Sequence, residues 1–460
     1  MFFHSTRGKD KDKDFSSILM QGLADDGGLF MPDYWPQIDL DEIKSQKSFV
    51  GVAKCVVPLF TSSSFSHQET LNIVESTWHD FEHKDLVGIK KLHNVSVLEL
   101  FHGPTAAFKD FGLQLAAAFF NKVLESENKT AIVLGATSGD TGSAAIDACK
   151  NYNRIKSFIM LPNGNMSEVQ QRQMSTIKSS NVFALRINGT FDDCQDLVKL
   201  AFQKRDFLKT DQYLLAVNSI NWTRIIGQIC YYFYAYNQLF EKENLNFSIP
   251  TGNFGNVFAC YSARKMGLPV NNISVAVNNN DILYRFFNEN DYSKQSVYET
   301  ISPSMDISVA SNFERLLYDF YLNRDSKKCL DYYTHFPNKG IKIDEKMWNK
   351  SSELFLSYSI NDDSTYECMQ HFSENFNYIM DPHTAVAAKA VVKANNSLSN
   401  KTVILSTAHP AKFPIALENA GINLDIIPKN LDKVLNMKEV GYKLSASEDL
   451  IFDFIKEKNK

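Results

Sequence analysis

Short apolar runs alternate with amphipathic stretches over most of the chain from about residue 96 onward. Each run is followed by a glycine or asparagine turn, which is typical of buried strands, whereas the stretches between the runs favour helices. We predict strands at residues 96–100, 130–135, 157–161, 182–187, 246–250, 273–277 and 402–406. This alternation predicts an α/β fold in which helices cover both faces of mostly parallel sheets. Ligands in such folds bind beyond the carboxyl ends of the strands, so we expect the chemistry in the loops there.

Three segments depart from the alternating pattern. Residues 1–95 are rich in aromatic and acidic side chains and contain helix-like runs, so we expect a small N-terminal helical domain. Residues 96–430 form the catalytic region, within which the Tyr-, Asn- and Lys-rich stretch 310–375 is predicted to be a helical insertion. Residues 431–460 are expected to form a C-terminal helical tail.

Composition and charge narrow the class of protein. The 460 residues carry 48 lysines and arginines against 53 aspartates and glutamates, and this net charge of -5 argues against nucleic acid as a partner. The seven cysteines lie far apart and none forms a C-x-x-C pair, so we expect no metal site and a reducing compartment. The N-terminus is charged, and no run approaches the ~20 apolar residues of a membrane span. We therefore expect a soluble, cytoplasmic protein.

Glycine-rich loops follow two of the predicted strands. Residues 136–145, ATSGDTGSAA, and residues 250–259, PTGNFGNVFA, each lead from a strand into a helix-compatible run. Free backbone N–H groups and the helix dipole meet at such a point and favour an anion. Neither loop matches the Walker A or the G-x-G-x-x-G dinucleotide pattern, so the sequence gives little support to nucleotide binding. A tight turn that merely starts a helix is the alternative for either loop.

The two loops differ in charge, which allows them to be assigned. The later loop has only uncharged side chains and two glycines, so its backbone can approach a dianionic phosphate closely. We expect the phosphate-binding residues to be Gly252, Asn253, Phe254, Gly255 and Asn256. The earlier loop contains an aspartate that would repel phosphate but can cap the following helix, so this loop suits a singly charged carboxylate. We assign Thr137, Ser138, Asp140 and Thr141 to the substrate site.

Lys109 lies in the stretch FHGPTAAFKDFG, residues 101–112. The Asp-Phe-Gly tripeptide that follows it resembles a kinase motif, but the chain has neither the Gly-rich loop nor the H-R-D loop of a kinase. The apolar residues before Lys109 would lower the pKa of its amine and make it nucleophilic toward an aldehyde. A lysine at a helix start is commonly a solvated surface residue. The two anion loops favour instead an aldehyde cofactor with a phosphate group, bound through a Schiff-base lysine.

Six motifs occur in the order HGPTAAFKDFG, ATSGDTG, NSINWTRIIGQ, PTGNFGN, DPHTAVA and TAHPAKF. Together with the N-terminal STRG and QGLADDGGLFMP, they resemble the threonine synthase family of pyridoxal-phosphate enzymes. The resemblance runs from about residue 5 to 413 and implies a two-lobed fold type II enzyme, with residues 1–95 as the leading domain of that family. Asn256 departs from the aspartate that many members have, which leaves a side-chain role at this position open.

The resemblance also implies roles for individual residues. Lys109 would form the Schiff base with pyridoxal 5'-phosphate and then shuttle protons, while loop 252–256 holds the cofactor phosphate. Thr407 would lie against the pyridine nitrogen, where a neutral hydroxyl makes the ring a milder electron sink. Arg224, assisted by Ser219 and Asn221, would bind the phosphate of the substrate O-phospho-L-homoserine. Neither Asp110 nor His383 is given a catalytic role.

The implied activity is the conversion of O-phospho-L-homoserine and water to L-threonine and phosphate, by γ-elimination and β-addition of water. A related phospho-lyase that releases 2-oxobutyrate from the same substrate is the alternative. A binding protein that keeps the cofactor pocket without catalysis is a third possibility. We expect a small-molecule substrate, no nucleic acid or membrane partner, no metal, and a monomer or homodimer.

Overall fold

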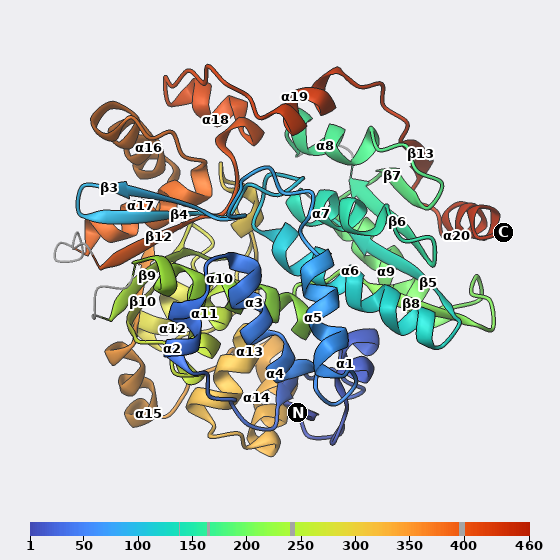
Figure 1. The fold of residues 1–460 in the computed structure, drawn as a ribbon, viewed down its shortest axis with the longest axis horizontal. Coiled ribbons are helices and arrows are strands. Elements are labelled where there is room, and N and C mark those ends of the chain that lie inside the picture. The colour runs from blue at the N-terminus through green and yellow to red at the C-terminus, as the bar shows by residue number, and fades with distance from the viewer. Residues whose placement is uncertain (138, 163–165, 240–243, 395–400) are drawn as a thin grey trace.

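Two large sheets form the framework of the protein. The computed structural model describes residues 1–137, 139–162, 166–239, 244–394 and 401–460. A six-stranded sheet has the order β11 (Phe355–Ser359), β10 (Val270–Val277), β9 (Leu245–Pro250), β12 (Thr402–Ser406), β4 (Val95–Glu99) and β3 (Gly88–Leu92). A five-stranded sheet has the order β13 (Tyr442–Ser445), β7 (Val182–Asn188), β6 (Ile155–Pro162), β5 (Thr130–Ala136) and β8 (Gln212–Ala216). Figure 1 shows the first sheet on the left and the second on the right.

The predicted α/β architecture is confirmed. All seven strands expected from the sequence are present, as β4, β5, β6, β7, β9, β10 and β12. Neighbouring strands in the described parts of both sheets run parallel, except for the antiparallel pair β3 and β4. The short strands β1 (Phe3–Ser5) and β2 (Phe30–Pro32) form a separate antiparallel pair in the N-terminal region.

Two segments expected to be helical also contain strands. Within 310–375, β11 pairs with β10 and extends the six-stranded sheet, so this stretch is not a purely helical insertion. Within the tail 431–460, β13 pairs with β7 at the edge of the other sheet. Both are edge strands, and three of the four residues of β13 are exposed. An edge strand with one partner needs no continuous apolar run, so the apolar pattern does not reveal it.

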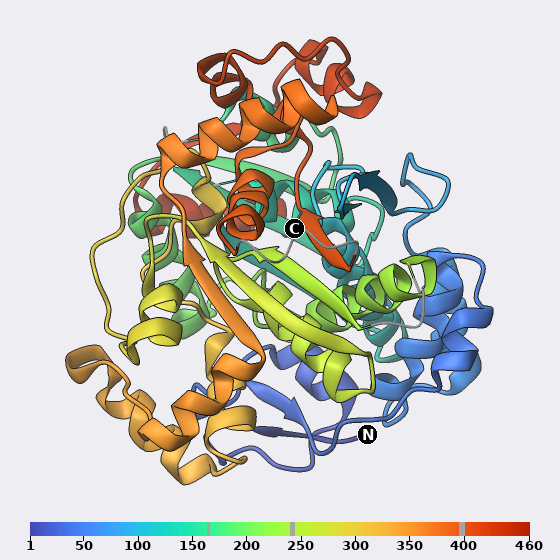
Figure 2. The same ribbon diagram turned by 90° about the vertical axis from the view of Figure 1, so that its left-hand side faces the viewer.

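Helices surround both sheets. The N-terminal ones are α1 (Phe15–Gln21), α2 (Leu40–Ser45), α3 (Phe49–Val56), α4 (Pro58–Thr61) and α5 (His67–Ser76). The next are α6 (Lys109–Ser126), α7 (Asp140–Cys149), α8 (Glu168–Ser175), α9 (Phe191–Lys204), α10 (Trp222–Leu239), α11 (Gly255–Lys265), α12 (Ile282–Glu289) and α13 (Phe313–Leu316). The last are α14 (Ser326–Lys339), α15 (Glu345–Asn349), α16 (Asp362–Phe376), α17 (Pro382–Lys393), α18 (Pro414–Asn419), α19 (Lys429–Asn436) and α20 (Glu448–Lys458). Helix α17 packs on one face of the six-stranded sheet and α11 on the other (Figure 2).

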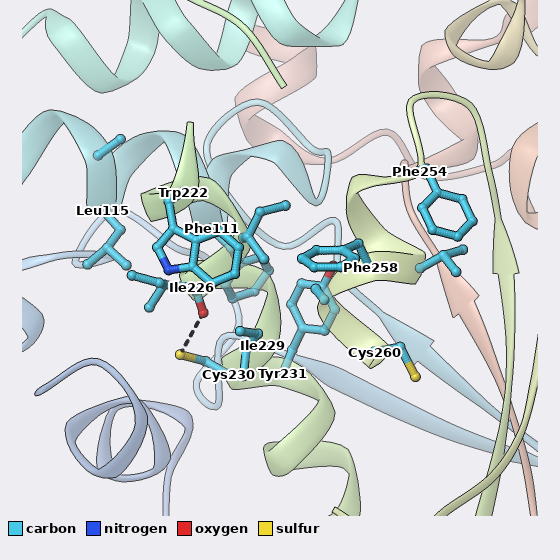
Figure 3. Packing of buried hydrophobic residues seen from close by; sticks show 14 of the residues in the cluster. Phe111, Leu115, Trp222, Ile226, Ile229, Cys230, Tyr231, Phe254, Phe258 and Cys260 are labelled. Atoms are coloured by element: carbon cyan, nitrogen blue, oxygen red, sulfur yellow. Dashed lines mark hydrogen bonds between the residues drawn. The ribbon is translucent and has the colours of Figure 1, made fainter. Parts of the chain in front are cut away.

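The core that positions the site lies where α6 crosses α10. A Cβ on Gly227 would lie 2.9 Å from the Phe111 carbonyl oxygen, and one on Gly112 would lie 3.0 Å from the Arg224 Cα. The two glycines therefore let the helix backbones approach closely. Aromatic side chains including Trp222, together with residues of α11, fill the space around this crossing (Figure 3). The crossing brings the start of α6, where Lys109 lies, beside the start of α10.

Candidate active site

Lys109 is the first residue of α6, and its side chain is almost buried, with 11% of its surface exposed. Its Nζ donates to Ser304 Oγ at 3.3 Å and lies 3.9 Å from Asp140 Oδ2. Burial, against the opposing charge of Asp140 and with smaller contributions from Lys412 and Arg224, lowers the pKa of the Lys109 amine to about 8. The uncharged amine, the form that acts as a nucleophile and a base, is therefore far more populated near neutral pH than in an ordinary lysine, at roughly a tenth of the total at pH 7.

The loop before Lys109 is held by the loop after β12. Phe108 N donates to the Thr407 carbonyl at 2.9 Å, and His409 N donates to the Ala106 carbonyl at 3.1 Å. These backbone bonds place Thr407, which is buried, directly beside the lysine loop. The expectation that Thr407 lies near the cofactor ring is compatible with this position and stays a prediction.

Asp110 shapes the same loop from within. Its carboxylate accepts from Thr105 N at 2.9 Å and from Thr105 Oγ1 at 2.6 Å. Burial, helped by the charge of Asp147 and opposed by the Thr105 hydrogen bonds, raises the pKa of Asp110 to about 7. Asp110 therefore ties the Gly-Pro turn to the start of α6. Among the described residues, no charged side chain makes a hydrogen bond or an ion pair with it.

The expected phosphate loop leads into α11. Phe254 has a left-handed backbone, with φ 63°, and no side chain among the described residues caps the helix at this N-cap position. Phe254 is itself buried against Phe313, with ring centroids 5.6 Å apart. The loop is thus anchored by an aromatic contact while its helix start is left without a side-chain partner, which suits a phosphate.

The side chain of Asn256 turns away into the core. Its Oδ1 accepts from the hydroxyls of Tyr231 at 2.5 Å and Tyr232 at 2.6 Å. Its Nδ2 is buried and has no hydrogen-bond partner in the described part of the chain. Asn256 contributes to the loop through its backbone and through these tyrosines.

The loop after β5 holds Asp140 in a buried ion pair. Its Oδ1 lies 2.7 Å from Lys412 Nζ and accepts from Gln170 Nε2 at 2.9 Å. Burial opposes the charge, but Lys412 and Lys109 together hold the pKa of Asp140 below its usual range. The Thr137 hydroxyl accepts from the N–H groups of Gly139 and Gly142, so it builds the loop itself. Thr141 is partly exposed on α7, and Ser138, which we assigned to the substrate site, lies outside the described residues.

The three residues expected to bind the substrate phosphate lie at the start of α10. Arg224 is buried and donates from Nη1 to the Asn218 carbonyl, and its Nε has no partner among the described residues. Burial lowers the pKa of Arg224 to about 10. Asn221 accepts from Thr223 N and donates to the Leu19 carbonyl, so its side chain fixes the helix start.

Residues 302–312 belong to the site but were not found from the sequence. Asn312 Nδ2 donates to the carbonyls of Ser219 and Asn253, and Ser311 Oγ bonds to the side chains of the same two residues. The segment thereby ties the expected cofactor loop to the expected substrate loop. Ser304, in the short helix η1 (Pro303–Met305), packs on Gly252 and accepts from Lys109. The only signal was a cluster of small polar residues with neither strand nor helix periodicity.

His383 has a structural position behind this segment. Its Nδ1 lies 2.7 Å from Asp381 Oδ1, and its Nε2 accepts from Ser304 N at 3.2 Å. Asp381 also accepts from the His383 N–H as the cap of α17. His383 therefore holds the backbone of Ser304.

The residues present fit an aldehyde cofactor with a phosphate group. A nucleophilic amine and an uncapped helix start with uncharged side chains in its loop meet around Ser304 and Gly252. Among the described residues, no group of histidine, cysteine, aspartate or glutamate side chains could hold a metal ion. None of the described helices combines the length and the apolar character needed to cross a membrane.

Comparison with known proteins finds three family models along the chain. Residues 87–332 match the family "Pyridoxal-phosphate dependent enzyme", residues 2–78 match "Threonine synthase N terminus", and residues 384–455 match "Threonine synthase, C-terminal". The chain is 43% identical to the threonine synthase of Pseudomonas aeruginosa, over 95% of this chain and 94% of that protein. A human protein named threonine synthase-like 2 is 33% identical, over 92% and 90%. The crystal structure of threonine synthase from Brucella melitensis with bound PLP superposes with a TM-score of 0.95 at 38% identity, covering 100% and 99% of the two chains.

Proposed function

The chain belongs to the threonine synthase family of pyridoxal-phosphate-dependent enzymes, and we propose that it converts O-phospho-L-homoserine and water to L-threonine and phosphate. The family resemblance inferred from the motifs is confirmed, and so is pyridoxal 5'-phosphate as the cofactor. The observation that carries the assignment of roles is the buried Lys109 amine, which lies between Asp140 and Ser304, a residue of η1 that packs on Gly252.

Each cofactor contact is assigned to a residue already placed near Lys109. When bound, pyridoxal phosphate supplies an electron sink that acidifies the C–H bonds of the linked substrate. Lys109 forms the covalent bond to the cofactor aldehyde, and the loop Gly252, Asn253, Phe254, Gly255 and Asn256 holds its phosphate through backbone N–H groups. The hydroxyl of Thr407 would be the partner of the ring nitrogen, and a neutral hydroxyl would not favour protonation of that nitrogen. The uncapped start of α11 supports the phosphate assignment.

Lys109 also moves the protons of the reaction. With the substrate bound, the Lys109 amine would remove the α proton and then a β proton of the substrate. Phosphate leaves from the γ carbon, a proton returns to that carbon, and water adds at the β carbon. Arg224 stabilises the departing phosphate, with Ser219 contributing its hydroxyl and Asn221 fixing the helix that carries the arginine. Thr137, Ser138, Asp140 and Thr141 form the loop that receives the substrate carboxylate.

Reduction of the holoenzyme with borohydride tests the lysine assignment. Peptide mapping is expected to find the reduced cofactor on Lys109, and Lys109→Ala is expected to lower turnover roughly 10²–10⁴-fold. Lys122→Ala is the matched control, because Lys122 lies on the same helix but pairs with Glu69 at 3.6 Å on the surface. Full turnover in Lys109→Ala, or the reduced cofactor on another lysine, would contradict the assignment.

Product analysis separates the proposed reaction from the related phospho-lyase reaction. The similarity to threonine synthase-like 2 makes this comparison necessary, because that protein is 33% identical over most of both chains. Incubation with O-phospho-L-homoserine is expected to release threonine and phosphate in equal amounts. Release of phosphate with 2-oxobutyrate in place of threonine would favour the lyase. No phosphate release by the loaded protein would favour a binding protein.

We further propose that the enzyme works in the cytoplasm as a monomer or homodimer, without nucleic acid or membrane partners. All seven cysteines lie in the described part of the chain and are free thiols, which supports a reducing compartment. The net charge of -5 supports the absence of a polyanionic partner. Light scattering during size-exclusion chromatography would measure the mass of the particle, and a tetramer or larger assembly would contradict the proposal.

A further inference from the structure

Lys412 is a buried cation next to the proposed catalytic lysine. It ends the short helix η4 (Pro410–Lys412), and none of its side-chain surface is exposed. Its Nζ lies 2.7 Å from Asp140 Oδ1 and donates to the Thr105 carbonyl at 2.8 Å. One ammonium group therefore joins the start of α7 to the loop that carries Lys109.

The Asp140 carboxylate is shared unequally between two lysines. Lys412 makes a short ion pair with Oδ1, which also accepts from Gln170, whereas Lys109 lies 3.9 Å from Oδ2. The charged side chains whose fields act on the Lys109 amine are Asp140 from α7, Lys412 from η4 and Arg224 from α10. With Lys109 neutral these three groups carry a net charge of about +1, which suits an anionic substrate.

We propose that Lys412 is a positioning residue that holds the Asp140 carboxylate and so prevents it from becoming the counter-ion of Lys109. The inference rests on the proposed function, because it takes Lys109 to be the amine that transfers protons. A base must release its proton as readily as it takes one. An unshared buried carboxylate beside the amine would keep it protonated, whereas a carboxylate neutralised by Lys412 does not.

A second contact of Lys412 acts on the backbone. The Thr105 carbonyl accepts from both Lys412 Nζ and Gln173 Nε2, each at 2.8 Å. Thr105 in turn donates to Asp110, the second residue of α6. Lys412 thereby holds both the loop that leads to Lys109 and the Asp140 carboxylate. This one side chain therefore sets the distance between the Lys109 amine and Asp140.

The pH titration of the holoenzyme's visible absorbance tests this inference without measuring activity. The midpoint of this titration is the pH at which the Lys109 nitrogen, while bonded to the cofactor, gains or loses a proton. In Lys412→Met the midpoint is expected to rise by about 1–2 pH units, because Asp140 is left unpaired beside that nitrogen. In the double variant Lys412→Met/Asp140→Asn it should return to the wild-type value or fall below it. Lys389→Met, which removes a lysine from the ion pair with Glu367, is the control and should leave the midpoint unchanged.

The acid limb of the kcat/KM profile should move with the absorbance midpoint in each variant. A midpoint in Lys412→Met within about 0.3 unit of wild type, or an equal rise in the double variant, would overturn the inference. If Lys412→Met does not fold, the double variant alone tests the inference. An absorbance midpoint above the wild-type value in the double variant would contradict an electrostatic role for Lys412. Failure of the proposed function is a separate result, since borohydride would then attach no cofactor to Lys109 in the wild-type enzyme.

Discussion

Replacing Gly252 with alanine should loosen the cofactor site through a single steric contact. A Cβ at this position would lie 2.8 Å from the Ser304 carbonyl oxygen and 3.2 Å from the Met305 Cα. Both neighbours are backbone atoms, so no side-chain rotation relieves the overlap. Either the loop 252–256 or the segment around Ser304 must move, and overpacking of this kind costs about 1–3 kcal/mol.

The cost should appear mainly in cofactor binding. The segment around Ser304 can relax in the free protein, whereas a cofactor held by Lys109 and the loop 252–256 would restrict that relaxation, because Ser304 packs on Gly252 and accepts from the Lys109 amine at 3.3 Å. If most of the cost falls on the loaded form, the dissociation constant for pyridoxal 5'-phosphate should rise roughly 5- to 150-fold. Titration of the protein freed of cofactor, followed by visible absorbance, measures this constant.

Gly255→Ala provides the matched control for stability in the same loop. The nearest atom to a Cβ at Gly255 is Asn312 Nδ2 at 3.4 Å, which is an ordinary contact. The thermal midpoint of the cofactor-free protein should therefore stay near wild type in Gly255→Ala and, because the free segment relaxes, fall by less than about 2 °C in Gly252→Ala. If Gly252→Ala bound the cofactor with an affinity within twofold of wild type, the steric reasoning would be refuted.

Three further variants test other parts of the site. Arg224→Lys should raise KM for O-phospho-L-homoserine about ten- to a hundredfold, because forked binding of phosphate is lost; unchanged steady-state kinetics and unchanged inhibition by phosphate would argue against this role. Asp110→Asn should change how the free energy of unfolding depends on pH. The folded-state pKa of Asp110 is raised to about 7, so the stability contributed by its neutral form is complete below about pH 4 and is lost as the pH rises through 7. The variant should therefore gain about 2 kcal/mol relative to wild type between pH 5 and pH 8 in urea denaturation, whereas an equal difference at both pH values would exclude the buried carboxyl as the cause. Arg315→Met should lower the free energy of unfolding by about 3 kcal/mol, because the fully buried guanidinium donates to the carbonyls of Phe30 and Ile220 and both would be left unpaired. If Arg315→Met unfolded at the same denaturant concentration as the wild-type protein, water would have replaced these hydrogen bonds.

The candidate site was partly predictable because its chemistry is local in the chain. Lys109 follows an apolar run and begins a helix, and the loop from Gly252 to Asn256 follows a strand and begins another. The strand–turn–helix pattern identifies such a loop without knowledge of the rest of the fold. Side-chain chemistry alone also distinguished the neutral loop from the one that contains Asp140.

Other site residues could not be predicted because their partners are distant in the sequence. Ser304 lies in a segment with no strand or helix period, and only the packing of that segment on Gly252 brings its hydroxyl to Lys109. The Thr137 hydroxyl was expected to face the substrate, but local backbone N–H groups occupy it. Hydroxyl groups serve backbone and ligand equally well, so their composition does not reveal which they bind.

The sequence by itself determined the class of fold and led to the predictions of the lysine and the two anion loops, because apolar periodicity and turn residues act over a few neighbouring positions. The tertiary structure alone decided which charges share the site. Lys412 and Thr105 are 307 positions apart, yet they form one hydrogen bond, because β12 lies beside β4 in the six-stranded sheet. That strand order places Lys412 against Asp140 and, through Asp140, sets the charge around Lys109. Such a field depends on distances between elements, which no local pattern contains.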